Sequence, residues 1–381
     1  VTLSQQTPFW GARFFGRWRL GRGEFPIYKK ADQTSDGGQA QIGVALPLLQ
    51  DGPIDPGRAA LRSASYRRRR AAAMVDAVLL QIQQQAAHAY WDWVAAGHIW
   101  RIAQGLLEIA ETRNVQLAAQ VAQGALPPIE QTDNQRAILN RQGLVIASRR
   151  AFEKAALALS RFYRGADGNP RVPSTANLPE ELPSASEMAF AGPREDLAFA
   201  LQHRPEVKVL AAEAQVLNVD RELFANQRWP ALDLLTAAGY DIGPEPFESE
   251  RTEIMVGLQL KVPLLIRKAR GNLAAAEAEI TALRAKLRYL NDNIGVAVAD
   301  AYSALRAAYE AIAAARAEAT VAHQVEEAER KRLSLGASNL LNVNLREKAA
   351  AEAEVRVVET STRYQKALAD YRAISARGFA D

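Results

Sequence analysis

The chain repeats a set of short motifs at an interval of about 212 residues, and this duplication constrains its fold more than any other feature. The repeated pairs are Pro47-Leu48-Leu49 and Pro263-Leu264-Leu265, Ala89-Tyr90 and Ala301-Tyr302, Gly124-Ala125 and Gly336-Ala337, and Gln135-Arg136-Ala137 and Glu347-Lys348-Ala349. The spacing from Tyr90 to Gly124 equals that from Tyr302 to Gly336, 34 residues in each copy. A repeat of this length indicates one architecture built from two copies of the same unit.

Each copy opens with two segments of alternating polarity, within residues 9–49 and 230–263. In the first segment Phe14 and Trp18 fall on one face and Arg13 and Arg17 on the other, the period-two pattern of a strand. Each segment has about ten residues, the length a tilted strand needs to cross a bilayer. Four strands cannot close a barrel, and open edges are not tolerated in lipid, so we expect a barrel shared between subunits.

Two long antiparallel helical hairpins are predicted over residues 57–164 and 269–376. The descending helices, 57–123 and 269–334, would each be about 100 Å long at 1.5 Å per residue. After residue 271 apolar residues recur with heptad spacing, which indicates a coiled-coil seam. One series is Leu273, Ile280, Leu287 and Ile294, continued by Ala301, Ala308 and Ala315, and the other is Ala276, Leu283, Leu290, Ala297 and Ala304. A glycine-bearing turn ends each descending helix.

Residues 165–229 read as an equatorial segment rich in Pro, Gly and Ser, followed by one upper helix from Arg194 to about Arg228. The second copy has no counterpart of that upper helix after its own hairpin. The duplication therefore predicts a helix of about 30 or more residues before Val1, with Gln6-Thr7-Pro8 standing where Arg228-Trp229-Pro230 stands.

Composition argues against several functional classes. The formal charge is +4, too small to indicate nucleic-acid binding, and the run Arg67 to Arg70 is interpreted as a solvated or phosphate-facing helix surface. The chain has no cysteine, and none of its four histidines is spaced i, i+3 or i+4 from another. It lacks a Gly-rich phosphate loop and a G-x-S-x-G turn. We therefore expect no catalytic residue, no cofactor and no metal site.

The combination of features resembles the TolC-like outer membrane factor family. His203-Arg204-Pro205-Glu206-Val207 with the alanine-rich helix after it is similar to that family's R-P-[DE]-[LV] segment. Residues 333–343, Leu-Ser-Leu-Gly-Ala-Ser-Asn-Leu-Leu-Asn-Val, resemble its helix-tip motif. The resemblance implies an α+β membrane protein, a homotrimer whose twelve pooled strands close an outer-membrane β-barrel continuous with a periplasmic α-helical barrel. It implies a passive exit duct of an efflux or type I secretion system, docked to a periplasmic adaptor and an inner-membrane pump.

The resemblance also directs attention to the tip turns, Gly124 and Gly336. The family often has acidic residues six and nine positions after the second tip glycine, where this chain has Asn342 and Leu345. In the first copy the same offsets give Glu130 and Asp133, which could form a carboxylate ring. An equal alternative is that these two acids only complement a helix N-terminus.

The polar strand faces supply candidate lumen residues, and polar barrel interiors are the default. The arginines suggest an anion-preferring upper channel as a hypothesis, with the acidic residues opposing it. The candidates are Arg13, Arg17, Arg19, Asp233, Asp241, Glu253 and Lys261.

A soluble periplasmic coiled-coil adaptor or structural protein is the alternative reading. An adaptor has one hairpin rather than two, and its strands need no aromatic lipid-facing side. Phe14, Trp18 and Tyr240 on the apolar strand faces favour the barrel, because aromatic residues suit a membrane interface.

Overall fold

The computed structural model describes residues 1–21, 34–185, 192–243 and 252–377. The chain divides into two compact units. Unit 1 comprises Val1–Val75 and Pro205–Leu290, and unit 2 comprises Asp76–Arg204 and Asn291–Asp381.

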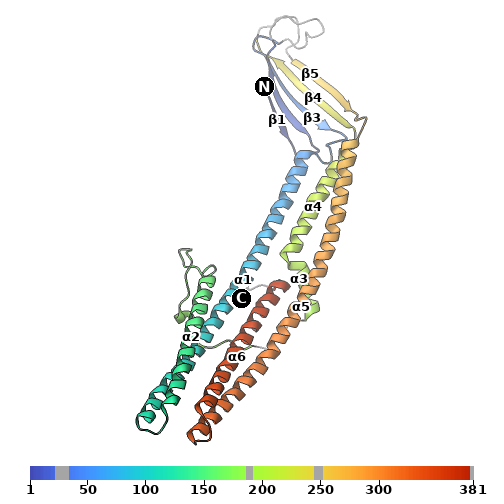
Figure 1. Ribbon diagram of the computed structural model, residues 1–381. Coiled ribbons are helices and arrows are strands. Elements are labelled where there is room, and N and C mark those ends of the chain that lie inside the picture. The colour runs from blue at the N-terminus through green and yellow to red at the C-terminus, as the bar shows by residue number, and fades with distance from the viewer. Residues whose placement is uncertain (22–33, 186–191, 244–251, 378–381) are drawn as a thin grey trace. The chain divides into compact units, whose positions relative to one another are not determined.

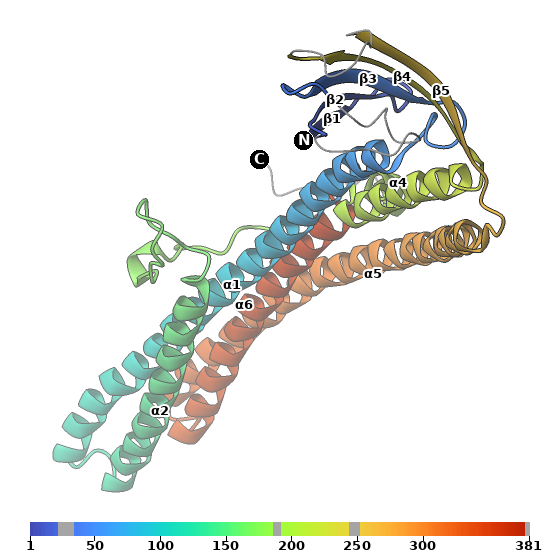
Figure 2. The ribbon, with the colours of Figure 1, turned by 90° about the horizontal axis from the view of Figure 1, so that it is seen from above.

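Unit 1 contains an antiparallel sheet with the strand order β1-β2-β3-β4-β5 (Figures 1 and 2). The strands are β1 (Thr2–Gln6), β2 (Arg13–Arg19), β3 (Gln39–Pro47), β4 (Ala231–Asp241) and β5 (Thr252–Lys261). β3 and β4 are neighbours in the sheet although residues 48–230 lie between them in the chain. The strands of both copies of the repeat therefore form one sheet.

The strand register separates an apolar face from a polar face. Phe14 pairs with Val44, Val44 with Thr236, and Thr236 with Val256, and directly paired residues share a face. The large exposed side chains of the apolar face are Leu3, Phe14, Trp18, Ile42, Tyr240, Ile254, Val256, Leu258 and Leu260. Apolar surface of this extent indicates contact with something other than water.

β1 is a strand that the sequence analysis does not predict. Where the repeat predicts a helix end at Gln6-Thr7-Pro8, Gln6 instead ends β1 and pairs with Arg13. A tight turn reverses the chain, with Trp10 and Gly11 in the left-handed region at φ 46° and 70°. The outer edge of β2 has backbone N–H and C=O groups that β3 does not pair, and β1 forms hydrogen bonds with them.

The helical part of unit 1 packs at the end of this sheet. α4 (Pro205–Asn226) buries Val219 against Ile54 and Ala59. The Asn226 side chain accepts a hydrogen bond of 2.8 Å from the backbone N–H of Asp51. These contacts fix the β3–α1 connection beside the C-terminal end of α4.

Two helical hairpins form, as the duplication predicts; unit 2 contains their turns, and the first parts of their two descending helices belong to unit 1. α1 (Pro56–Ala122) turns into α2 (Pro128–Leu159), and α5 (Arg267–Ser334) turns into α6 (Leu340–Ser375) (Figure 1). Gly124 and Gly336 stand at the turns with φ of 72° and 73°. Glycine adopts this left-handed conformation at a helix C-terminus without a Cβ clash, which explains why both turns carry it.

Aromatic residues form the core of the first hairpin. Trp93 and Val94 of α1 pack against Phe152 of α2 and against Leu178, which lies in the connection after α2. A Cβ at Gly97 would lie 2.6 Å from the Leu178 side chain, so the missing side chain admits that leucine. The connection, which includes a 3-10 turn at Thr175–Asn177, is therefore anchored to its own hairpin.

The first predicted series of α5 is confirmed at Ala301, Ala308 and Ala315, which are buried, but the second series departs from the heptads after Ile294. The predicted positions Ala297 and Ala304 are not buried, because larger apolar neighbours take the core positions and bury more area. The buried residues of this second series are Val298, Leu305, Ile312 and Ala319. The step from Ile294 to Val298 is four residues where the heptad pattern requires three, which is a stutter.

The predicted single helix from Arg194 to Arg228 is two helices. α3 (Pro193–His203) ends before Arg204, whose backbone is extended at ψ 130°, and α4 starts at Pro205. Proline has no N–H and excludes the helical conformation from the residue before it, so the chain breaks there. Within unit 2, Asp196 of α3 is buried and accepts hydrogen bonds from Tyr371 Oη and Arg377 Nε, which ties the end of α6 to α3.

Candidate functional site

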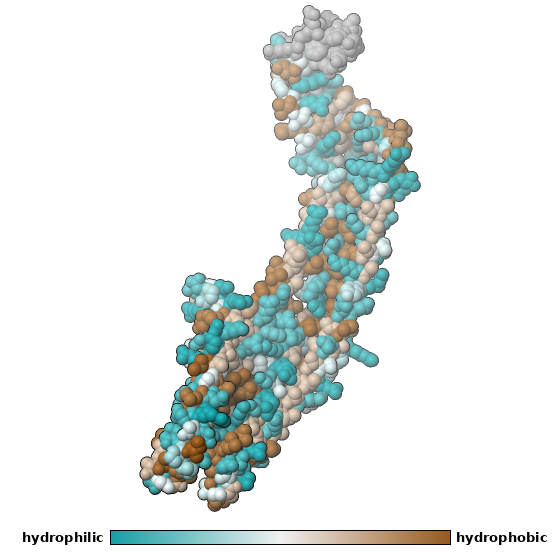
Figure 3. Space-filling model, in the orientation of Figure 1, coloured by the Kyte–Doolittle hydropathy of each residue, from teal (hydrophilic) through white to brown (hydrophobic). Residues whose placement is uncertain are grey.

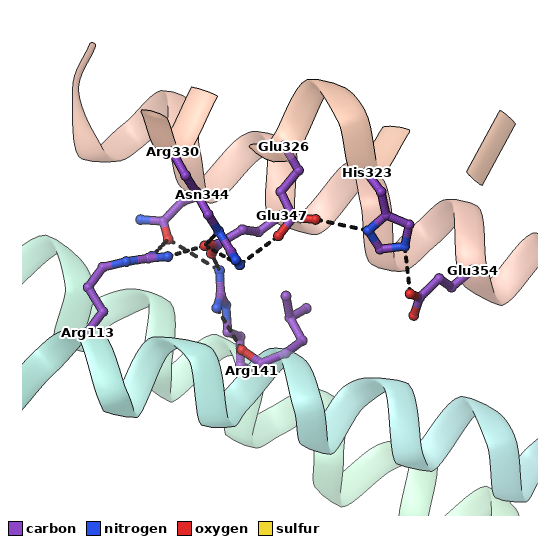
Figure 4. A network of polar contacts seen from close by, with 9 residues as sticks. Arg113, Arg141, His323, Glu326, Arg330, Asn344, Glu347 and Glu354 are labelled. Carbon is purple, nitrogen blue, oxygen red and sulfur yellow. Dashed lines mark hydrogen bonds and ion pairs between the residues drawn. The ribbon is translucent and has the colours of Figure 1, made fainter. Parts of the chain in front are cut away.

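The most concentrated polar network of unit 2 surrounds Glu347 and joins all four hairpin helices (Figure 4). On α6, Leu340, Val343, Glu347 and Ala350 are buried at alternating steps of three and four residues. Glu347 therefore occupies a core position of the helix, and its side chain is 0% exposed. A carboxylate in such a position requires charged partners.

Three arginines from three different helices surround the Glu347 carboxylate. Arg141 of α2 donates from Nη2 to Oε2 at 2.8 Å, and Arg330 of α5 donates from Nε to Oε1 at 3.2 Å. Arg113 of α1 donates from Nη2 to Oε1. Arg113 and Arg141 also donate to Asn344 Oδ1, at 2.8 and 3.2 Å. The carboxylate thus holds the two hairpins together within unit 2.

The arginines set the ionisation of Glu347. Burial alone would raise the pKa of this carboxyl, but hydrogen bonds and charge from Arg141 and Arg113 outweigh burial and hold the pKa below its ordinary value of 4.5. Glu347 is therefore an anion at neutral pH. A buried ion pair whose hydrogen bonds are satisfied holds its partners strongly, because removing one partner leaves an uncompensated charge.

The network continues along α5 through a second carboxylate and a histidine. Glu326 accepts from Arg330 Nη2 at 2.6 Å and contacts His323 Nδ1 at 3.2 Å. His323 Nε2 lies 2.7 Å from Glu354 Oε1 of α6. Three guanidinium groups thus face three carboxylates through a chain of direct contacts (Figure 4).

The predicted tip residues are only partly brought together. Asp133 of α2 and Leu345 of α6 line the same groove, which has a volume of about 630 Å³. Glu130 lies in the first turn of α2 and is half-buried. Asn342 lies in the first turn of α6, where its backbone N–H donates to the side chain of Asn339 at 3.0 Å. Glu130 and Asn342 are not among the residues that line this groove.

The predicted lumen residues share the polar face of the sheet, and some of them meet at Gln39. Arg19 Nε donates to Gln39 Oε1 at 2.6 Å, and Gln39 Nε2 donates to Asp241 at 3.2 Å and Glu253 at 3.1 Å. Arg13 and Arg17 stand on the same face and are exposed. Gln39 is buried and is not one of the predicted site residues, although its central strand position could have indicated it.

The sequence hides the Glu347 network for an identifiable reason. Glu347 stands out there only as part of a repeated motif, opposite Gln135 of the first copy. Continuing the observed α5 seam from Ala319 in steps of three and four residues places Glu326 and Glu329 at core positions, and both are buried. Carboxylates at core positions of a coiled coil signal specific polar contacts. The second predicted series, one residue out of phase after Ile294, misses Glu326, whereas the first series continued by sevens from Ala315 reaches Glu329.

The described residues contain no helix that could cross a membrane and no cluster of metal-binding side chains. No helix there carries an apolar stretch long enough to span a bilayer. The same residues contain no group of three or more side chains able to hold a metal ion. The sites that remain to be interpreted are the Glu347 network, the tip turns and the two faces of the sheet.

Solved structures of outer membrane proteins share the fold along nearly the whole chain. The crystal structure of the outer membrane protein VceC from Vibrio cholerae matches with a TM-score of 0.72 at 16% identity, covering 100% of this chain and 88% of VceC. The MtrE outer membrane channel of Neisseria gonorrhoeae, in its open state, matches with a TM-score of 0.69 at 16% identity, covering 98% and 80%. A membrane protein from Pseudomonas aeruginosa matches with a TM-score of 0.71 at 16% identity, covering 98% and 83%.

Sequence comparison is informative at the level of the family. No curated protein sequence matches the chain. The family model of the outer membrane efflux protein matches residues 197–376, which run from α3 through β4 and β5 to the end of the second hairpin. Residues 197–376 thus match the outer membrane efflux protein family, and the fold shared with the solved structures extends over both copies of the repeat.

Proposed function

We propose that this chain is a passive exit duct of the outer membrane, acting in a tripartite efflux or type I secretion system. The observation that carries the proposal is the two-faced sheet. Its apolar face exposes residues such as Ile254 and Val256, and its opposite face holds the Arg19–Gln39–Glu253 cluster. A lipid-facing apolar side and a polar lumen side are the requirements of a transmembrane barrel.

The sheet supports a barrel assembled from several copies. β1 and β5 are its edge strands within the described residues, and an edge inside lipid must be paired. β1 is the shortest strand with five residues and β2 has seven, whereas β3, β4 and β5 have nine, eleven and ten, the length that a tilted spanning strand needs. β2 to β5 are the longer strands, and three copies pool them into the twelve-stranded barrel of a homotrimer.

The two hairpins form the periplasmic part of the duct in this proposal. The family match of residues 197–376 and the outer-membrane channels that share the fold support it. The tips, with Gly124 and Gly336, would dock to a periplasmic adaptor and through it to an inner-membrane pump. The chain itself would carry out no catalysis, since a duct only has to provide a path.

The tip region is where we place the constriction. Glu130 and Asp133, each present three times in a trimer, would form carboxylate rings that favour cations. The Glu347 network lies farther along the same helices and fixes the second hairpin against the first. Any movement that separates the hairpins has to break these ion pairs.

Planar-bilayer recordings on the detergent-purified full chain test the proposal. We expect a trimer in detergent, outer-membrane fractionation and stepwise conductance. Glu130→Gln with Asp133→Asn should reduce cation preference, measured as a reversal potential in a KCl gradient. The matched control is Glu153→Gln, which removes an exposed carboxylate of α2 paired with Arg149. A monomer extracted without detergent would refute the duct, and strong cation selectivity in the double variant would refute both the carboxylate rings and an anion-preferring upper channel.

A further inference from the structure

Seven exposed apolar side chains gather at the edge of the sheet that leads into the helices. Two pairs come from the duplicated Pro-Leu-Leu motif, and Leu264 is the most exposed of the set at 94%. The seven, named here the apolar rim, are Phe9, Trp10, Leu48, Leu49, Trp229, Leu264 and Leu265.

Hydrogen bonds place these residues at one level of the sheet. The backbone N–H of Leu48 donates to Leu232 O at 2.7 Å, which sets Leu48 beside the start of β4 and close to Trp229. β5 ends at Lys261, opposite Ala231, so Leu264 follows directly beyond the same edge. The β1–β2 turn reaches this edge too, since a Cβ on Gly52 would lie 2.7 Å from Trp10 Nε1.

Positive charge begins directly after the rim on both long helices. Residues 56–75, at the start of α1, contain six arginines and no acidic residue. Residues 262–276 contain three cations and no acidic residue. Figure 3 shows apolar side chains over the turn after β5, next to hydrophilic ones at the start of α5. The duplication thus places the same apolar-then-basic order in both copies.

Most of these cations have no acidic partner within the described part of the chain. Arg58 pairs with Asp55, and Arg62 pairs with Glu222 at 2.8 Å. The remaining seven, named the basic collar, make no ion pair with another described residue. They are Arg67, Arg68, Arg69, Arg70, Arg267, Lys268 and Arg270. Four successive arginines lie 100° apart around α1, so they cover most of its circumference whichever side faces outward.

We propose that the apolar rim and basic collar together bind the phosphate headgroups of anionic phospholipids in the leaflet on the helix side of the membrane. Leucine and tryptophan side chains reach the hydrocarbon boundary, and the collar meets the headgroups just outside it. The cations of the collar, which have no acidic partner among the described residues, complement the negative charge of the headgroups. The exposed apolar rim beside them complements the hydrocarbon of the same leaflet. The inference rests on the proposed function, because it requires the sheet to lie in a bilayer.

Spin-labelled lipids test the proposal on the full chain reconstituted in phosphatidylcholine vesicles. Labelled phosphatidylglycerol and labelled phosphatidylcholine each report the fraction of lipid immobilised by the protein, and the ratio of association constants gives the headgroup preference. The native chain should prefer phosphatidylglycerol. The triple variant Arg267→Gln, Lys268→Gln and Arg270→Gln should lower the ratio about fivefold, which corresponds to the attraction between about one cation and the anionic surface.

The same helix offers a matched control. Arg284→Gln, Lys286→Gln and Arg288→Gln remove three exposed cations of α5 about 26 Å farther along the helix at 1.5 Å per residue. This variant should keep the native ratio, and an unchanged total of immobilised lipid shows that both variants are inserted. A native ratio near one, or an equal loss in both variants, overturns the inference alone. If neither labelled lipid is immobilised by the native chain, the proposed barrel fails and the inference with it.

Discussion

Replacing Glu347 by glutamine tests whether one buried carboxylate holds the two hairpins together. The substitution keeps the shape of the side chain and removes its charge. Arg113 and Arg141, whose side chains are 12% and 7% exposed, then remain buried beside each other without a counter-ion. Arg330 is 44% exposed, and water can still solvate it.

The expected loss follows from this difference in exposure. Removing one partner of a buried pair costs about 3–5 kcal/mol, because the other charge stays desolvated. Glu318→Gln is the matched control, since Glu318 of α5 pairs with Arg356 of α6 at 2.6 Å within the second hairpin but both side chains are about half exposed. Exposed pairs of this kind contribute about 0–1 kcal/mol.

Hydrogen exchange measured by mass spectrometry on the purified full chain separates the two variants. At 1.4 kcal/mol per factor of ten, Glu347→Gln should accelerate exchange over residues 137–150 and 340–353 by about 10² to 4 × 10³, where local opening governs exchange. Glu318→Gln should change it by less than about fivefold. Adding Arg141→Met to Glu347→Gln should slow exchange again in part, because one of the two uncompensated charges is gone while that of Arg113 stays. Equal, small effects of both glutamine variants would refute the argument.

Two further predictions concern pH and the tip turns. The pKa of Glu347 is below 4.5 in the folded chain. The ionised carboxylate therefore contributes its full stability above pH 4.5, and this stability is lost as the pH falls through the pKa of the folded state. Hydrogen exchange in α6 should accelerate in acid, and much less so in Glu347→Gln. Gly124→Ala and Gly336→Ala should each cost about 1–2 kcal/mol at the left-handed tip positions, measured as faster proteolysis of the turns. Gly143→Ala, in the interior of α2 with open space around it, should instead stabilise by about 0.5–1 kcal/mol, and equal effects at all three glycines would contradict the backbone argument.

The fold is largely predictable where a repeating pattern carries the information. Alternation in β2 to β5 assigns Phe14 and Arg13 to opposite faces, and the register agrees. Heptads and tip glycines predict both hairpins. The repeating pattern does not predict features that occur only once. These are the helix break at Pro205, the chain reversal at Trp10 and Gly11, and the stutter after Ile294.

The candidate site is harder to predict than the fold. Arg113, Arg141, Arg330 and Glu347 come from four helices, and charged residues on long helices usually face solvent. In the sequence Glu347 and its neighbour Lys348 are both charged helix residues, and only the burial of Glu347 shows that it belongs to the network. That distinction requires the correct rotational phase of each helix. On α5 the second predicted series loses this phase after Ile294.

The stutter in α5 limits how the length of this helix can change in evolution. Deleting seven residues between Val298 and Ala319 leaves every later side chain on nearly the same side of the helix, because two turns contain about seven residues. Deleting one residue there rotates everything beyond it by about 100°, so that Glu326 and Glu329 leave the seam. Related channels should therefore differ in helix length by whole heptads, or by paired changes in α5 and α6 that restore the phase.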